Sequence, residues 1–121
     1  MLKNPRYLNL TFNKLYIDQC LFSSVKIITI VEGKVPFEKV KDFEESYRFL
    51  KRGDLPKGLV SSILIKNKDD SKYRIQSTWD SFESLDNMRK NVDIPAAIKL
   101  FQQVGVEPNL EIYEIIEEIL T

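Results

Sequence analysis

The sequence predicts an α+β domain, a two-layer βαββαβ unit in which helices cover one side of an antiparallel four-stranded sheet. Two kinds of pattern support this class. Short β-branched or alternating segments predict strands, and longer segments with apolar residues at steps of three and four predict helices. Their order is strand, helix, strand, strand, helix, followed by an isoleucine-rich C-terminal segment. A chain of 121 residues with 43% apolar residues suffices for one such domain.

Residues 1–22 stand apart as an N-terminal extension, ahead of a domain that we place at residues 23–121. The pattern of the extension leaves two alternatives open, a short hairpin formed by Tyr7–Phe12 and Leu15–Ile17 or a partly ordered leader. It lacks the uninterrupted apolar stretch of a signal peptide, and no later segment is apolar for long enough to span a membrane. Cys20, the single cysteine, cannot form an intramolecular disulfide. We therefore expect a soluble, cytoplasmic protein.

The first strand is predicted at Val25–Val31, which is β-branched almost throughout and is followed by the turn-like composition of Glu32–Lys34. Pro36 suits the first position of a helix. One apolar stripe then follows at helical spacing, formed by Phe37, Val40, Phe43, Tyr47 and Leu50. Gly53 and Pro56 are expected to end this helix.

A hairpin is predicted next, with strands at Leu59–Ile65 and Tyr73–Trp79 and a loop at Asn67–Ser71. In the second of these strands alternate residues point to opposite faces. One face then carries Tyr73, Ile75, Ser77 and Trp79, and the other carries Arg74, Gln76 and Thr78. Because Trp79 ends the strand, we expect its ring to lie over the seam between sheet and helix, with its N–H bound to an acceptor.

Two helical segments follow, the second of them running from Pro95 to about Val104. Asp80 or Ser81 is placed to cap the first helix, with Glu83 three residues after Asp80 in a box-like arrangement. The apolar stripes consist of Phe82, Leu85 and Met88 in the first helix and of Ala97, Ile98, Phe101 and Val104 in the second.

The C-terminal segment can be interpreted in two ways. Its isoleucines fit a helical stripe, and periodicity alone slightly favours a helix, whereas Leu110–Ile115 is also rich in the branched and aromatic residues of a strand. Three strands would leave the βαββαβ unit without its fourth strand. We therefore assign a strand to Asn109–Glu117, with a last helical turn after it.

Histidine is absent from the chain, and this absence excludes several chemistries. Nucleophiles that need a histidine base cannot be built, nor can histidine zinc sites, and the usual proximal ligand of haem iron is missing. Lysine plus arginine equals aspartate plus glutamate, 18 each, so no net charge attracts nucleic acid or an anionic membrane. We predict no cofactor, no metal, no nucleic-acid partner and no membrane partner.

Three segments, Pro56–Leu64, Tyr73–Ser81 and Glu111–Ile115, together resemble the antibiotic biosynthesis monooxygenase domain family. The resemblance extends over about Val25–Ile116, and a strand-end tryptophan followed by Asp-Ser and a helix is its most specific part. It implies a ferredoxin-like fold whose members pair sheet to sheet as dimeric α/β barrels. It also implies cofactor-independent or haem-linked oxygen chemistry on polyketide aromatics, quinols or haem, although many similar domains have no assigned activity.

The haem-degrading members of this family use an asparagine, a tryptophan and a histidine. The corresponding positions here are roughly Lys26, Met88 and Ile98, and none of them matches. Relatives also often carry a carboxylate two residues before the strand-end tryptophan, where this chain has Ser77. Haem degradation is therefore disfavoured.

By resemblance, we expect a cofactor-independent monooxygenase-like protein that holds a small aromatic or quinol-type molecule in an apolar cleft between helices and sheet. No catalytic residue is assigned. The candidate pocket residues are Phe43, Tyr47, Tyr73, Trp79 and Met88, with the tyrosines and the tryptophan orienting the ring. Packing explains Trp79 more readily than ligand contact does, and tyrosines often lie at a core edge.

The alternative is a non-catalytic small-molecule-binding or structural dimer module of the same fold. A cleft filled by Phe43, Phe82, Met88 and Phe101 would favour this alternative, and a large dry pocket with a convergent polar group would favour the enzyme. In both cases we expect a homodimer, because isoleucines and valines of the first two strands leave an apolar sheet face that helices do not cover.

Overall fold

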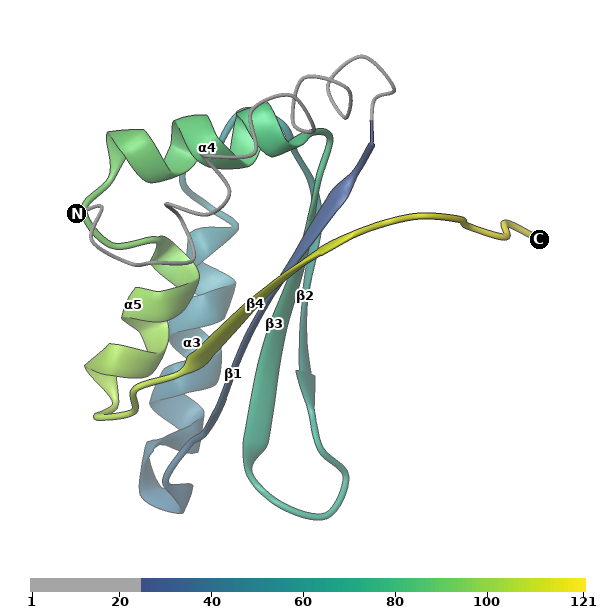
Figure 1. The fold of residues 1–121 in the computed structure, drawn as a ribbon. Coiled ribbons are helices and arrows are strands. Elements are labelled where there is room, and N and C mark those ends of the chain that lie inside the picture. Colours follow the sequence, from purple (N-terminus) through teal and green to yellow (C-terminus); the bar gives the residue numbers. More distant parts are fainter. Residues whose placement is uncertain (1–24) are drawn as a thin grey trace.

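The computed structural model describes residues 25–121, so the predicted N-terminal hairpin and Cys20 lie outside the described residues. With the labels of Figure 1, the elements are β1 (Ile27–Lys34), η1 (Phe37–Lys39, a 3-10 turn), α3 (Val40–Leu50), β2 (Leu59–Lys66), β3 (Lys72–Trp79), α4 (Phe82–Asn91), α5 (Ala96–Gln103) and β4 (Asn109–Glu114). The strands form one sheet in the order β2-β3-β1-β4, and every neighbouring pair is antiparallel. The helices lie on one side of it (Figure 1). The predicted α+β, ferredoxin-like class is confirmed.

Strand β1 runs three residues further than predicted and includes the supposed turn. Gly33 pairs with Tyr73 and Lys34 with Lys72, so the ladder to β3 continues through both residues. A Cβ atom at Gly33 would lie 2.9 Å from Val106 Cγ1 and 3.0 Å from Phe101 Cδ1. The glycine therefore serves close packing of α5 and its following loop against the strand rather than a reversal of the chain.

The helix after β1 begins later than its apolar stripe predicts. Residues 37–39 form the 3-10 turn, and α3 starts at Val40. A 3-10 turn has three residues per turn, so it shifts the phase of the stripe, and Phe37 is 88% exposed. The prediction that Phe37 belongs to the stripe is wrong. Phe43 is fully buried, and Tyr47 and Leu50 pack against the core.

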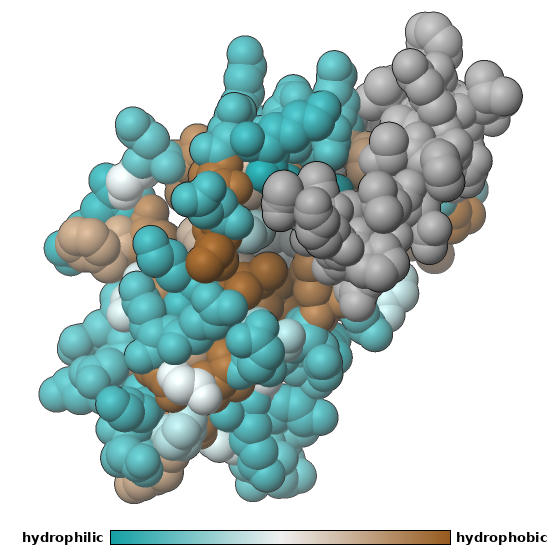
Figure 2. Space-filling model, turned by 60° about the vertical axis from the view of Figure 1, so that its left-hand side comes forward, coloured by the Kyte–Doolittle hydropathy of each residue, from teal (hydrophilic) through white to brown (hydrophobic). Residues whose placement is uncertain are grey.

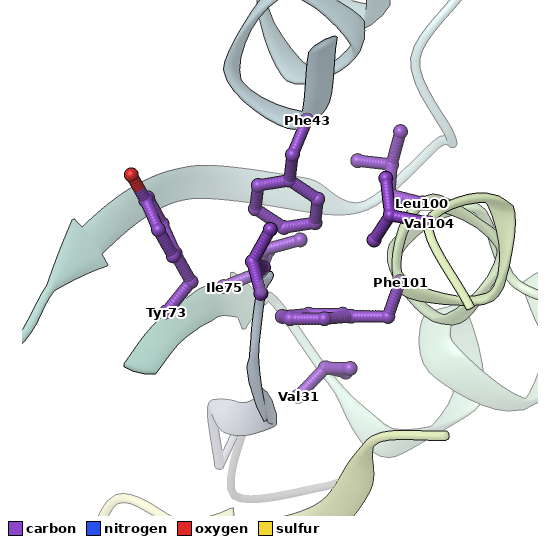
Figure 3. Packing of buried hydrophobic residues seen from close by; sticks show 8 residues of the cluster. Val31, Phe43, Tyr73, Ile75, Leu100, Phe101 and Val104 are labelled. Carbon is purple, nitrogen blue, oxygen red and sulfur yellow. The ribbon is translucent and has the colours of Figure 1, made fainter. Parts of the chain in front are cut away.

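The larger of two core clusters lies between α3, α5 and the central strands (Figure 3). The Phe43 ring contacts the edge of Tyr73 with 5.1 Å between centroids, and it lies 4.7 Å from Phe101. Leu100 is also buried there, although the predicted stripe of α5 omitted it. The second cluster consists of Ile27, Trp79, Phe82 and Leu85.

Trp79 links the sheet to α4 as predicted. Its side chain is 4% exposed, and Nε1 donates a hydrogen bond of 3.2 Å to Oγ1 of Thr29. Ser81 is the N-cap, and its Oγ accepts a bond of 3.1 Å from the backbone N–H of Ser84. Ser81, one of the two predicted candidates, therefore occupies the capping position, and Ser84 rather than Glu83 lies three residues after the cap.

The C-terminal segment forms β4, which confirms the predicted strand, although it ends at Glu114 rather than near Glu117. It pairs with β1 from Glu32↔Asn109 to Ile27↔Glu114, and a bond of 3.0 Å from Ile115 N to Lys26 O follows. The helical turn predicted after it is wrong, because residues 115–121 contain no helix. So short a helix is unstable without packing, and this segment runs beyond the sheet away from the helices (Figure 1).

Candidate functional site

A cleft of about 950 Å³ lies between the helices and the covered face of the sheet. Its walls come from the C-terminal half of α3 and the following loop, from β2, from the inward side chains of β1 and β3, and from parts of α4 and α5. Figure 2 brings the helix side forward and shows apolar side chains gathered in the middle of that side, with polar ones around them. The helices therefore leave part of the apolar interior open.

Four of the five predicted pocket residues line this cleft, namely Tyr47, Tyr73, Trp79 and Met88. The fifth, Phe43, does not line it and lies behind Tyr73 in the core (Figure 3). Phe82 and Phe101, which would have filled the cleft in a purely structural module, are also buried in the two clusters and do not line it. Of the four residues that were expected to fill the cleft, Met88 alone lies on its wall.

Tyr73 and Glu44 form the most polar contact on the cleft wall. The Tyr73 hydroxyl donates a hydrogen bond of 2.5 Å to Oε2 of Glu44. Burial of the phenol, and then the hydrogen bond and charge of Glu44, raise the pKa of Tyr73 to about 12. At neutral pH the phenol is therefore a stable hydrogen-bond donor. Oε1 of the same carboxylate lies 3.4 Å from the guanidinium of Arg48.

A chain of hydroxyl groups follows further along the cleft. The Tyr47 hydroxyl lies 2.8 Å from Oγ of Ser62, and Oγ of Ser77 donates a bond of 3.3 Å to the same oxygen. This chain joins α3 to β2 and β3 across the wall of the cleft. The family resemblance implied a carboxylate at the position of Ser77, and the serine hydroxyl found there donates to Ser62 instead.

Sequence reasoning missed Glu44, Ser62 and Arg89, which also line the cleft. A signal for Glu44 was present, because it precedes Tyr47 by three residues and so lies on the same helical face. Ser62 pairs with Ser77 across β2 and β3, which only the strand register reveals. Arg89 falls one residue after the stripe position of Met88, so the apolar periodicity does not select it.

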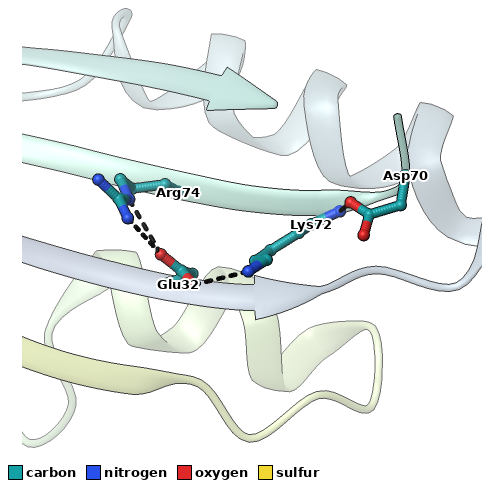
Figure 4. Close-up of polar contacts among 4 residues, drawn as sticks. All are labelled: Glu32, Asp70, Lys72 and Arg74. Atoms are coloured by element: carbon teal, nitrogen blue, oxygen red, sulfur yellow. Dashed lines mark hydrogen bonds and ion pairs between the residues drawn. The ribbon is translucent and has the colours of Figure 1, made fainter. Parts of the chain in front are cut away.

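The uncovered sheet face carries a separate ion-pair network (Figure 4). Nε and Nη2 of Arg74 bind Oε1 of Glu32 at 3.0 and 2.8 Å, and Nζ of Lys72 lies 3.6 Å from Oε2. The hydrogen bond from Arg74 is the main cause that lowers the pKa of Glu32. The same face also carries four isoleucines, Ile28, Ile30, Ile63 and Ile65. The face is thus a mixture of apolar and charged side chains, less uniform than predicted.

Two general findings concern the described residues. Within residues 25–121, every helix is too short or too polar for a membrane crossing. In the same part of the chain, no group of three or more histidine, cysteine, aspartate or glutamate side chains is arranged to hold a metal ion.

Comparison with solved structures places this fold among known ones. Two similar structures are described as putative antibiotic biosynthesis monooxygenases. The protein from Deinococcus radiodurans has a TM-score of 0.64 at 13% identity, covering 78% of this chain and 97% of that one. The protein from Caulobacter crescentus has a TM-score of 0.62 at 19% identity, covering 78% and 92%. The chain therefore has the fold that the sequence resemblance implied.

A third similar structure is a mutant of MhuD with two manganese protoporphyrin IX molecules per active site. Its TM-score is 0.61 at 16% identity, and the match covers 78% of this chain and 99% of that one. No family model matches the sequence. No curated protein matches it either.

Proposed function

We propose that this protein is a cofactor-independent, monooxygenase-like enzyme that acts on a small aromatic or quinol-type molecule. The observation that carries this proposal is that the cleft is open, because the predicted core aromatics Phe43, Phe82 and Phe101 do not line it. It is about 950 Å³ in size, within the range of small-molecule sites, and its wall combines apolar side chains with the Tyr73–Glu44 pair. The similarity to monooxygenase-like folds supports the same class of chemistry.

The chemistry requires no electron donor besides the substrate. Conversion of a phenol to a quinone by one O2 is balanced, since one oxygen atom replaces hydrogen on the ring and the other leaves as water. The substrate supplies all the electrons, and the protein must bind the ring, exclude water and accept the proton of the phenol. Deprotonation makes the ring electron-rich enough to reduce O2.

The residues of the cleft fit these tasks. Trp79 and Met88 offer apolar surface to an aromatic ring, and Tyr73 offers a hydroxyl that stays protonated at neutral pH. Glu44 offers a carboxylate as the proton acceptor, beside the hydroxyl that would orient the substrate oxygen. The chain lacks the asparagine, tryptophan and histidine that the haem-degrading members use, and it contains no histidine at all. Haem degradation is therefore not proposed.

The test is oxygen uptake by the full chain with a panel of phenols and quinols. We expect uptake with at least one of them and a loss of about 10²-fold or more in Glu44→Gln, as for removal of a general base. Tyr113→Phe is the matched control, because Tyr113 also donates to a carboxylate, that of Glu111, at 2.8 Å but outside the cleft. If no compound of the panel gives oxygen uptake, the proposal of an enzyme is contradicted. The alternative, a non-catalytic small-molecule-binding module, would then be favoured.

We further propose that two copies pair through the uncovered sheet face. Ile63 and Ile65 are 49% and 42% exposed there, and Tyr113 of β4 is 48% exposed. Beyond β4, Ile116, Ile119 and Leu120 are at least 78% exposed. So much apolar surface is typical of an interface rather than of an isolated monomer. The expectation of a homodimer rests on this surface.

A further inference from the structure

We infer that the hydroxyl pair of Tyr47 and Ser62 determines specificity, because it donates one hydrogen bond to an acceptor oxygen on the ligand ring. The favoured ligand then carries a second oxygen, such as that of a carbonyl group, besides its phenol. This inference rests on the proposed function, because it concerns the occupant of the same cleft. It gives the pair a binding role that is separate from proton acceptance by Glu44.

The first argument is a count of hydroxyl hydrogens. Tyr47, Ser62 and Ser77 carry one each. Ser77 donates its hydrogen to Oγ of Ser62 at 3.3 Å, and the contact of 2.8 Å between Tyr47 and Ser62 uses one more, in either direction. Within residues 25–121 these three side chains make no further hydrogen bond. One hydrogen is therefore left over, on Tyr47 or on Ser62.

The second argument is the surroundings of this leftover hydrogen. Tyr47 and Ser62 are half-buried and line the cleft. Leu64, on the same face of β2 as Ser62, and its cross-strand partner Ile75 add apolar wall beside them. A ring that fills this part of the cleft displaces water from the hydrogen, and a ring without an acceptor would leave it buried and unpaired. The site therefore favours a ring with an acceptor oxygen over the same ring without one.

The third argument is the position of the pair relative to Glu44. The Tyr73 hydroxyl donates its one hydrogen to Glu44, so Tyr73 has none left for a carbonyl oxygen. Tyr47 follows Glu44 by three residues on α3, which is about 4.5 Å along the helix axis and on the same face. The proton acceptor and the leftover donor are therefore close enough for one small ligand to reach both. A ring with its phenol at Glu44 and a second oxygen at the Tyr47–Ser62 pair satisfies both groups.

The test measures the binding of two neutral probes, 1-indanone, which has a carbonyl oxygen, and indane, which has none, by equilibrium dialysis against the full chain. The quantity compared is the ratio of the dissociation constant of indane to that of indanone. Transfer of the probes out of water is the same for every variant, so a change in this ratio reports the site.

The variants follow from the count of hydrogens. Ser77→Ala is the matched control, because Ser77 only donates to Ser62 and its loss keeps the leftover hydrogen. We expect this variant, Tyr47→Phe alone and Ser62→Ala alone to retain the ratio of the unchanged protein, since each still has a hydrogen to donate. The triple variant, with all three substitutions, has none, and we expect its ratio to fall about fivefold or more.

The outcomes separate the inference from the proposed function. Equal ratios in the triple variant and in Ser77→Ala would overturn the inference, and a ratio already lost in Ser77→Ala would overturn the assignment to the Tyr47–Ser62 pair. Binding of neither probe to the unchanged protein would also overturn the inference, whereas oxygen uptake decides the proposed function by itself. If the triple variant fails to fold, the infrared carbonyl band of indanone bound to the unchanged chain decides. A hydrogen bond lowers its frequency, and a band at the position found in an apolar solvent would overturn the inference.

Discussion

Single residues at the cleft determine both its polarity and its walls. Tyr73 belongs to two environments, because its ring contacts Phe43 in the core and its hydroxyl reaches Glu44. The residue is 1% exposed, so the phenol has lost almost all contact with solvent. Burial of this kind disfavours the phenolate, and the adjacent carboxylate disfavours it further. One tyrosine therefore stabilises the fold while its hydroxyl holds the Glu44 carboxylate at the wall of the cleft.

The raised pKa of Tyr73 predicts how stability depends on alkaline pH. The folded value is about 12 and the ordinary value is 10.0, so the neutral phenol favours the folded state. This stabilisation is complete below pH 10 and is lost as the pH rises towards 12. We expect ultraviolet titration of the tyrosines to show a late step that Tyr73→Phe removes and Tyr113→Phe leaves in place. Superimposable curves for Tyr73→Phe and the unchanged protein would contradict the assignment.

Prediction from sequence succeeded at residues whose role follows from the strand period. The inward face of β3, Tyr73 to Trp79, was correct at every second position, and the Trp79 N–H found an acceptor as expected. Glu44 was missed because its role depends on what stands opposite it, which one sequence does not reveal. Composition treats a charged helical residue as solvated, whereas Glu44 lines a cleft.

At the scale of elements, the boundaries were harder to predict than the elements themselves. Composition at residues 32–34 favours a turn, but pairing with β3 carries β1 through them. Periodicity favoured a helix near the C-terminus, and the need for a fourth strand correctly outweighed it. Cross-strand pairing and packing outweigh local preference in both places, because each contributes more free energy than the propensity of a few residues.

Gly33 gives a test of this close packing. In Gly33→Ala the new methyl group would meet Val106 and Phe101 at 2.9 and 3.0 Å, so α5 or its loop must shift. We expect a loss of about 1–3 kcal/mol in the free energy of unfolding, measured by urea denaturation. Gly53→Ala is the control, since the nearest atom to its new methyl group is Leu50 O at 3.9 Å. Equal stability of the two variants would mean that α5 does not pack so tightly on β1.

At the scale of the whole molecule, the two faces of the sheet have different tasks. The covered face supplies the core and one wall of the cleft. The other face carries isoleucines and the Glu32–Arg74 pair, which Figure 4 shows. A charged pair on a partly apolar face limits how a partner can be placed there, because a misaligned partner would bury the charges without compensation. A second copy of the chain offers the same mixture and suits this arrangement.

Pairing through this face predicts how the association state responds to a single charge. Ile30 lies on central strand β1, between Gln76 and Glu111 on the uncovered side. We expect sedimentation velocity to show a dimer of the unchanged chain and a monomer of Ile30→Lys, because two unpaired ammonium groups would be buried at the interface. Phe37→Lys, on the helix side at 88% exposure, should leave the dimer intact. A monomeric unchanged chain at micromolar concentration, or a dimeric and folded Ile30→Lys, would show that this face is not the interface.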